Sequence, residues 1–226
     1  MDGIGIVLLI LFIGIAIAAA IYGVLAARKR REELSALAAR LGLTFRPEND
    51  HALASQFGFL DKLAQGSNRY AFNVLSGNYH GHQATAFDYH YETPSTNSKG
   101  HRQTHHHYFA FFILLLPRSF PELRITREGM LSKVAQVFGY DDIDFESAEF
   151  SRSFCVRSKD KKFAYDVCHA QMMEYLLANR DLSIEIEANA LALAFDSRLS
   201  APQIEFNLQR LLDIRSRLPD YLFTTV

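Results

Sequence analysis

The chain begins with an unbroken run of apolar side chains. Residues 4–27 contain no charged side chain, and four basic residues follow at once: Arg28, Lys29, Arg30 and Arg31. A helix rises about 1.5 Å per residue, so this run is long enough to cross a hydrocarbon core of roughly 30 Å. A cleaved signal peptide has a basic N-terminal region and a shorter apolar run, and a buried core helix is rarely apolar all round. The pattern therefore predicts a short N-terminus at 1–3 and a transmembrane helix at 4–27.

A helical spacing of apolar residues continues beyond the basic residues. It places four of them at i, i+3, i+4 and i+7: Leu34, Leu37, Ala38 and Leu41. Gly42 then supplies a common C-terminal stop for a helix. We expect a basic, amphipathic helical extension over 28–41, with its apolar stripe packed on the domain that follows.

Residues 42–118 show the alternation typical of β-strands. Segments 68–75 and 82–91 alternate and flank Gly77 and Asn78, a pair of the kind found in hairpin turns. We therefore expect a hairpin whose second strand presents alternate side chains to opposite faces of a sheet. Its aromatic residues share one face, and the other face carries His82, Asp88 and His90.

A third strand follows the hairpin. Residues 105–116 form a long apolar strand pattern that we expect to end at Pro117, and the polar segment 92–102 before it reads as an exposed, mobile loop. Together these segments predict an antiparallel sheet of three or more strands.

Residues 119–226 mix helical and strand patterns. Thr126 is expected to cap a helix that ends near residue 138, and the acidic run 141–149 to lead into a strand over 150–157. Within the acidic run, a solvated strand face explains the carboxylates better than a calcium loop, since the turn glycine and terminal glutamate of such a loop are missing.

Another helical region and a second hairpin are predicted further along. Asp160 can cap a helical region that reaches Asn179, where Cys168 and His169 mark the place of a possible break. Segments 183–187 and 190–195 alternate strictly, so they predict a hairpin joined at Ala188 and Asn189.

A capping box and proline mark the start of the last helix, in the sequence Ser200-Ala201-Pro202-Gln203. The order of strands, helices, hairpin and helix is typical of an α+β fold. We predict an N-terminal transmembrane helix followed by a soluble domain with an antiparallel sheet and flanking helices, made of a strand-rich half, 42–118, and an α+β half, 119–226.

Four segments carry a resemblance to known sequences. They are 37–45 (LAARLGLTF), 68–91 with the run AFDYHYET near its end, 141–157 (DDIDFESAEFSRSFCVR) and 154–177 with AYDVCHAQMMEYLL. The chain resembles a family of uncharacterised bacterial single-pass membrane proteins, in which a domain of unknown function follows an N-terminal transmembrane helix. The resemblance implies this architecture and an inner-membrane location, but no activity, ligand or catalytic residue.

The charges beside the apolar run predict its orientation. Four basic residues follow it and none precedes it, so the positive-inside rule places the soluble domain in the cytoplasm. Gly14, Ala18 and Gly23 belong to small-residue patterns that would permit a homodimer of helices. The high frequency of Gly and Ala in membrane helices explains them more simply.

Charge and cysteine content narrow the function classes. With 24 Lys and Arg against 25 Asp and Glu, and no basic cluster beyond position 31, nucleic acid is not an expected partner. Cys155 and Cys168 both lie in apolar surroundings and read as buried small hydrophobes, not as activated thiolates. No common catalytic or nucleotide-binding motif is present, so catalysis is disfavoured without being excluded.

Histidine is the residue type that clusters, within the strand-rich half. If the second and third strands pair, Asp88 and His90 would lie beside His105 or His107, and imidazole with carboxylate suits zinc or another divalent transition metal. The spacing matches no established ligand signature, and ordinary hydrogen-bonding histidines at strand ends explain the cluster without a metal.

Three functions are compatible with these features. We favour a membrane-anchored binding or accessory domain whose partner is another membrane or cytoplasmic protein, because an anchored domain without catalytic residues gains from its proximity to other membrane proteins. The alternatives are a metal-dependent hydrolase that uses the residues above, and a pH or metal sensor based on the same histidines.

Overall fold

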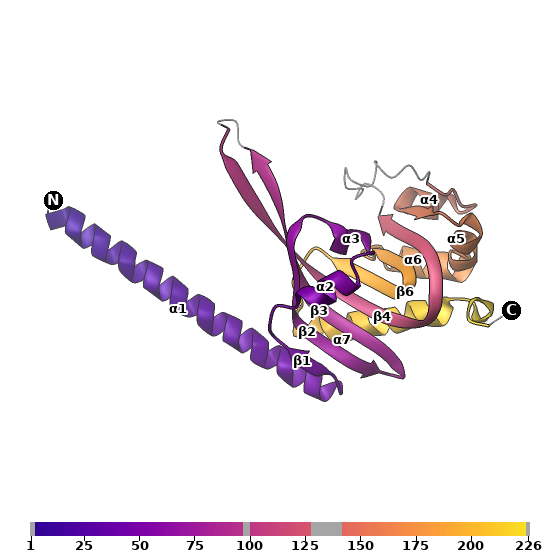
Figure 1. The fold of residues 1–226 in the computed structure, drawn as a ribbon, viewed down its shortest axis with the longest axis horizontal. Helices are drawn as coiled ribbons and strands as arrows, with labels where there is room; N and C mark the ends of the chain where they lie inside the picture. The colour runs from indigo at the N-terminus through magenta and orange to yellow at the C-terminus, as the bar shows by residue number, and fades with distance from the viewer. Residues whose placement is uncertain (1–2, 97–99, 128–141, 225–226) are drawn as a thin grey trace.

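A six-stranded antiparallel sheet forms the body of the domain (Figure 1). The computed structural model describes residues 3–96, 100–127 and 142–224. The strands are hydrogen-bonded in the order β1-β2-β3-β4-β5, and β6 also pairs with β4. Their bounds are β1 (Thr44–Arg46), β2 (Ser67–Tyr79), β3 (His82–Thr96), β4 (Arg102–Arg127), β5 (Phe154–Ser158) and β6 (Ile184–Phe195). The long β4 therefore joins strands from both halves of the sequence in one sheet.

Helices cover both faces of this sheet. They are α1 (Gly3–Arg40), α2 (His51–Gln56), α3 (Asp61–Ala64), α4 (Ala148–Ser153), α5 (Lys161–Val167), α6 (Ala170–Ala178) and α7 (Ala201–Arg217), followed by the short 3-10 helix η2 (Asp220–Leu222). The larger core cluster packs one face against the end of α1 and helices α4 to α7, and a smaller cluster packs the opposite face against α2 and α3. The predicted α+β class is confirmed.

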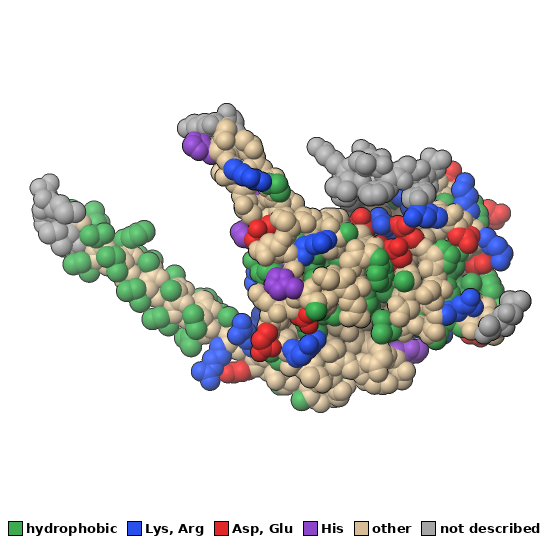
Figure 2. Space-filling view, in the orientation of Figure 1, with side chains coloured by type: hydrophobic (Ala, Val, Ile, Leu, Met, Phe, Trp, Pro, Cys, Tyr) green, Lys and Arg blue, Asp and Glu red, His purple; other side chains and the backbone are tan. Residues whose placement is uncertain are grey.

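The apolar run and its amphipathic extension form one continuous helix, α1. Among the described residues, it is the one helix long and apolar enough to cross a membrane. Leu34, Leu37 and Ala38 are buried in the larger core cluster, whereas the apolar side chains of the first part of α1 are exposed (Figure 2). The helix ends where Gly42 adopts a φ of +70° and the Leu43 N–H donates to the Ala38 carbonyl at 2.8 Å. The predicted docking stripe and helix stop are therefore correct.

The turn between β2 and β3 lies later than predicted. Gly77 and Asn78 are inside β2, and the turn is made by His80 and Gly81, whose φ values are +48° and +87°. Two residues with positive φ form the turn type whose twist suits a two-residue hairpin. Gly77 instead lets β2 pass the end of α1, since a Cβ there would lie 3.2 Å from Leu43 Cδ2.

Beyond the main sheet, β3 and β4 continue as a two-stranded ribbon that projects from the domain (Figure 1). The segment 92–102, predicted as a loop, is strand as far as Thr96 and again from Arg102. Residues 97–99 lie outside the described part of the chain. The loop prediction is wrong for the paired residues because an isolated ribbon exposes both faces to water, so its polar composition resembles that of a loop.

Two predicted strand ends are in fact irregularities within strands. Pro117 lies inside β4, where the pairing with β6 is irregular between Leu115 and Phe120. The predicted hairpin at Ala188 and Asn189 is wrong, because β6 runs through both and pairs with β4 on either side. Ala188 has a φ of +49°, so the residues that suggested a turn form a bulge.

The helix caps of the second half agree with the prediction in part. Asp160 accepts a hydrogen bond from the Phe163 N–H at the start of α5. Helix α7 begins after Ser200 with proline in its first turn, but the predicted capping box is wrong, because the Ser200 hydroxyl donates to Gln203 Oε1 and makes no capping bond to the backbone. Thr126 is no cap, because it lies in β4 opposite Cys155. The helix predicted after Thr126 falls on residues 128–138, outside the described part of the chain.

The strand predicted at 150–157 also needs correction. The first part of this segment belongs to α4, which Ser147 caps by accepting from the Phe150 N–H, and β5 begins only at Phe154. A local cap therefore prevails over the apolar pattern that suggested a longer strand.

Candidate functional site

A polar junction joins α1 to the sheet. The Arg30 guanidinium donates to Asp88 Oδ2 at 2.7 Å and to the Leu199 carbonyl at 2.8 Å. Asp88, which is fully buried, also accepts from Asn73 Nδ2 and from the Leu199 N–H, each at 2.8 Å. Arg30, expected only as a membrane-flanking charge, therefore holds three separate segments together.

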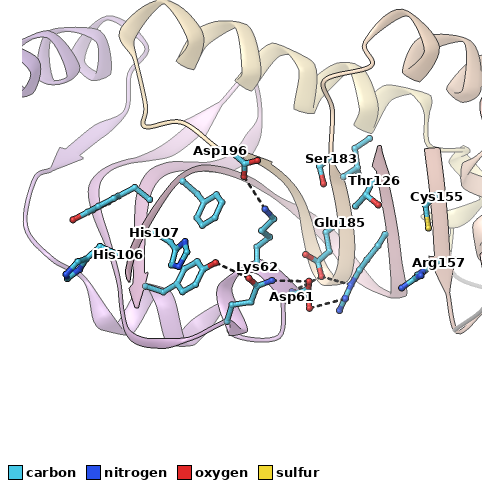
Figure 3. Close-up of a pocket in the computed structure, with 16 residues that line it drawn as sticks. Asp61, Lys62, His106, His107, Thr126, Cys155, Arg157, Ser183, Glu185 and Asp196 are labelled. Carbon is cyan, nitrogen blue, oxygen red and sulfur yellow. Dashed lines mark hydrogen bonds and ion pairs between the residues drawn. The ribbon is translucent and has the colours of Figure 1, made fainter. Parts of the chain in front are cut away.

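A cleft of about 490 Å³ opens on the face of the sheet that carries α3 (Figure 3). Its lining comes from α3, the base of the ribbon, and strands β4, β5 and β6. Such a volume falls in the range of pockets that hold small ligands or a partner's side chains. The cleft is therefore the first candidate for a binding site on the domain.

One end of the cleft is charged. Arg124 lies between carboxylates, with contacts of 3.1 Å to Asp61, 2.7 Å to Glu122 and 3.2 Å to Glu185. Glu185 also accepts from the Asp61 N–H at 2.9 Å. Burial raises the pKa of Glu185 to about 7, although the nearby Arg124 opposes the shift. This end of the cleft can therefore gain or lose a proton near neutral pH.

The middle and the other end of the cleft are lined by aromatic and basic side chains. The Lys62 ammonium lies 4.5 Å from the centre of the Phe109 ring and 3.2 Å from Asp196, as Figure 3 shows for the ion pair. Tyr91 stacks on Phe109 on one side, at 5.6 Å between centroids, and on His107 on the other, at 4.6 Å. The cleft therefore offers flat apolar surface beside charges of both signs, a combination that suits amphipathic side chains.

Neither cysteine is an activated nucleophile. Burial raises the pKa of Cys155 to about 11, and it raises the pKa of the deeply buried Cys168 further. A thiol that stays protonated at neutral pH is a poor nucleophile. Both residues serve as buried hydrophobes, as the sequence predicted.

The four residues predicted to bind a metal do not converge. In the register of β3 and β4, Asp88 and His90 share one face of the sheet, whereas His105 and His107 lie on the other. Asp88 is engaged by Arg30, and the ring nitrogens of His105 and His107 bond to Ser95 and Thr93, at 2.7 and 2.8 Å. His90 instead meets His106, with 3.0 Å between Nε2 and Nδ1.

Sequence reasoning missed most of the cleft. Glu185 lies on a strand whose alternation was recognised, but alternation does not tell which of two faces carries a pocket. Arg124 lies beyond Pro117, where the strand was expected to end. Asp61 and Lys62 form a four-residue helix too short to give a periodic signal. Asp88 was predicted as a possible metal ligand, and in the structure its carboxylate accepts from Arg30.

Comparisons with known proteins give one similar fold. Neither a protein family nor a curated protein sequence matches the chain. Among solved structures, it resembles the mycobacterial trehalose monomycolate transport factor A, TtfA, with a TM-score of 0.62 over 85% of this chain and 97% of that one. The identity is 12%, so the likeness concerns the fold.

Proposed function

We propose that the protein is a membrane-anchored accessory factor, with its domain in the cytoplasm and a protein partner at the membrane surface. The observation that carries this proposal is the continuity of α1 from its apolar part into the core of the domain. A flexible tether only keeps a domain near the membrane, whereas a helix fixed by Leu34, Leu37 and the Arg30–Asp88 pair also sets its orientation. A set orientation is useful to a domain that must meet another membrane-bound protein.

The ribbon and the adjoining cleft are the surface on which we place the partner. The ribbon projects from the domain, and His106 and His107 at its base also line the cleft. TtfA has a similar fold and is a transport factor, so a membrane transport system is the first place to look for the partner.

In-cell crosslinking and affinity purification of the full-length protein test the proposal. The wild type is compared with a shortened-ribbon variant, in which Asn-Gly replaces residues 93–105. Glu92 and His106 face each other, so a two-residue turn can join them. We expect a near-stoichiometric protein partner with the wild type and its loss with the shortened ribbon. A control with Lys161→Ala and Lys162→Ala, on α5, should retain it.

The outcomes separate the parts of the proposal. Recovery of the partner by the shortened variant would move the surface away from the ribbon. Absence of any stoichiometric protein partner would contradict the accessory role itself.

A further inference from the structure

Three potential ligands converge at the base of the ribbon, on the face of the β3–β4 pair opposite to Tyr91 and His107. His90 and Glu92 are alternate residues of β3, and His106 faces Glu92 across the β3–β4 pair. His106 Nδ1 lies 3.0 Å from His90 Nε2 and 3.4 Å from Glu92 Oε1, and the last two atoms are 4.0 Å apart. Two imidazoles and a carboxylate thus bring three potential metal-ligand atoms within 4.0 Å of one another.

Asn68 positions two of these side chains. Its carbonyl lies 3.1 Å from His90 Nδ1, and since a carbonyl can only accept, Nδ1 must carry the proton. His90 Nε2 is then unprotonated, and its lone pair faces His106. The Asn68 side-chain nitrogen also donates to Glu92 Oε1 at 2.7 Å. A backbone carbonyl on one histidine and an amide on the carboxylate are the outer partners typical of metal ligands.

Asn68 is held in place by the fold. It has a φ of +48°, in the left-handed region, where the pairing of β2 with β3 is irregular between Ser67 and Tyr70. Tyr70 then stacks on the His90 ring at 4.5 Å between centroids. His90 is therefore fixed on both sides, by a bulge and by an aromatic ring.

We propose that His90, Glu92 and His106 bind one divalent transition-metal ion, with zinc as the first candidate. Ligand atoms at about 2.0–2.1 Å from a tetrahedral zinc ion lie roughly 3.3 Å from one another, a spacing within the 3.0 to 4.0 Å between these three donor atoms. His90 is buried, Glu92 is partly exposed and His106 is half-exposed, so a fourth ligand can come from solvent. Three protein ligands with one open position are the usual set of a reactive or exchangeable zinc site.

The local charges permit this assignment. Burial lowers the pKa of His90, which keeps its imidazole neutral and able to bind a metal at neutral pH. The Glu92 carboxylate partly balances the charge of the ion. Arg198 is a positive charge near His90 that acts against the binding of a cation. Its guanidinium lies 4.0 Å from the centre of the Tyr108 ring.

Metal binding by the full-length protein without a histidine tag, purified in detergent, tests the site. The readouts are the zinc content after dialysis, the affinity by calorimetry, and the visible absorption of a cobalt(II) substitute, which reports tetrahedral coordination. Glu92→Gln keeps the shape of the side chain and its bond from Asn68, and His106→Gln changes a half-exposed residue, so both variants should fold. We expect one ion per chain, and at least about tenfold weaker binding in each variant.

His105→Gln is the matched control, because it removes a ribbon histidine on the other face. It should bind zinc with unchanged affinity. No stoichiometric zinc on the wild type, or equal affinity in Glu92→Gln and His106→Gln, would overturn the site and leave a metal-free hydrogen bond between two histidines. The shortened ribbon described above keeps all three ligands, so loss of the partner and loss of the metal are distinguishable.

Discussion

Asp88 and Arg30 show how much can depend on single buried charges. Asp88 has no exposure to solvent, and its oxygens accept from a helix, a strand and a loop. Removing one partner from such a group leaves an unpaired charge in the interior, which costs far more than loss of a surface ion pair. Arg28 and Arg30 belong to one basic run, but Arg28 pairs with the exposed Glu32 and Arg30 with the buried Asp88.

Arg30→Ala is therefore expected to lower the free energy of unfolding by about 3 kcal/mol. Arg28→Ala, which removes only an exposed pair with Glu32, should change it by less than about 0.5 kcal/mol. Urea unfolding followed by tyrosine fluorescence in detergent measures both. Equal effects would mean that the basic run acts only through the membrane.

Glu185 gives the domain a pH dependence. Its pKa is raised from 4.5 to about 7 in the folded protein, so the folded state binds more protons than the unfolded state between these values. The free energy of unfolding of the wild type should therefore fall as the pH rises through this window.

The variant Glu185→Gln isolates that contribution. It retains an acceptor for the Asp61 N–H and cannot ionise, so its stability relative to the wild type should increase by up to about 3 kcal/mol between pH 4.5 and 7. Unfolding curves at a series of pH values provide the measurement. A constant difference between the two proteins would show that Glu185 stays ionised in the fold.

At the scale of the elements, the sequence predicts faces better than ends. Alternation correctly placed Asp88 and His90 on one side of β3, because the period of a strand is fixed by its geometry. The ends of β4 and β6 were wrong, since proline and the Ala188-Asn189 pair also occur at bulges.

Strand register limits the prediction of the histidine site in the same way. A shift by one residue moves every side chain of a strand to the other face. The pairing of Glu92 with His106 brings His90, Glu92 and His106 to one face and puts His105 and His107 on the other. The sequence of the ribbon does not specify that register.

The bulge in β6 offers a test at this scale. Ala188 has a positive φ, which costs a residue with a Cβ about 1 kcal/mol and costs glycine little. Ala188→Gly should therefore be neutral or stabilising by up to about 1 kcal/mol. Ala192→Gly, in the regular part of β6, should be destabilising by a similar amount. Chemical denaturation distinguishes them, and a comparable loss in both variants would contradict the bulge.

The whole molecule combines an apolar helix with a domain of balanced charge, so its placement depends on the helix and its basic flank. The positive-inside rule predicts that the C-terminal side stays in the cytoplasm. A C-terminal fluorescent protein should then be fluorescent, and a C-terminal alkaline phosphatase, which needs export, should be inactive. The reverse pattern would place the domain outside.

The continuity of α1 has a mechanical consequence. A membrane helix adjusts its tilt to the thickness of the bilayer around it, and here no hinge separates the tilting part from the part packed in the domain. In a thinner bilayer the helix would tilt further from the membrane normal, and the domain with its ribbon would rotate by the same angle. The domain would thus convert local lipid thickness into the direction in which its binding surface points.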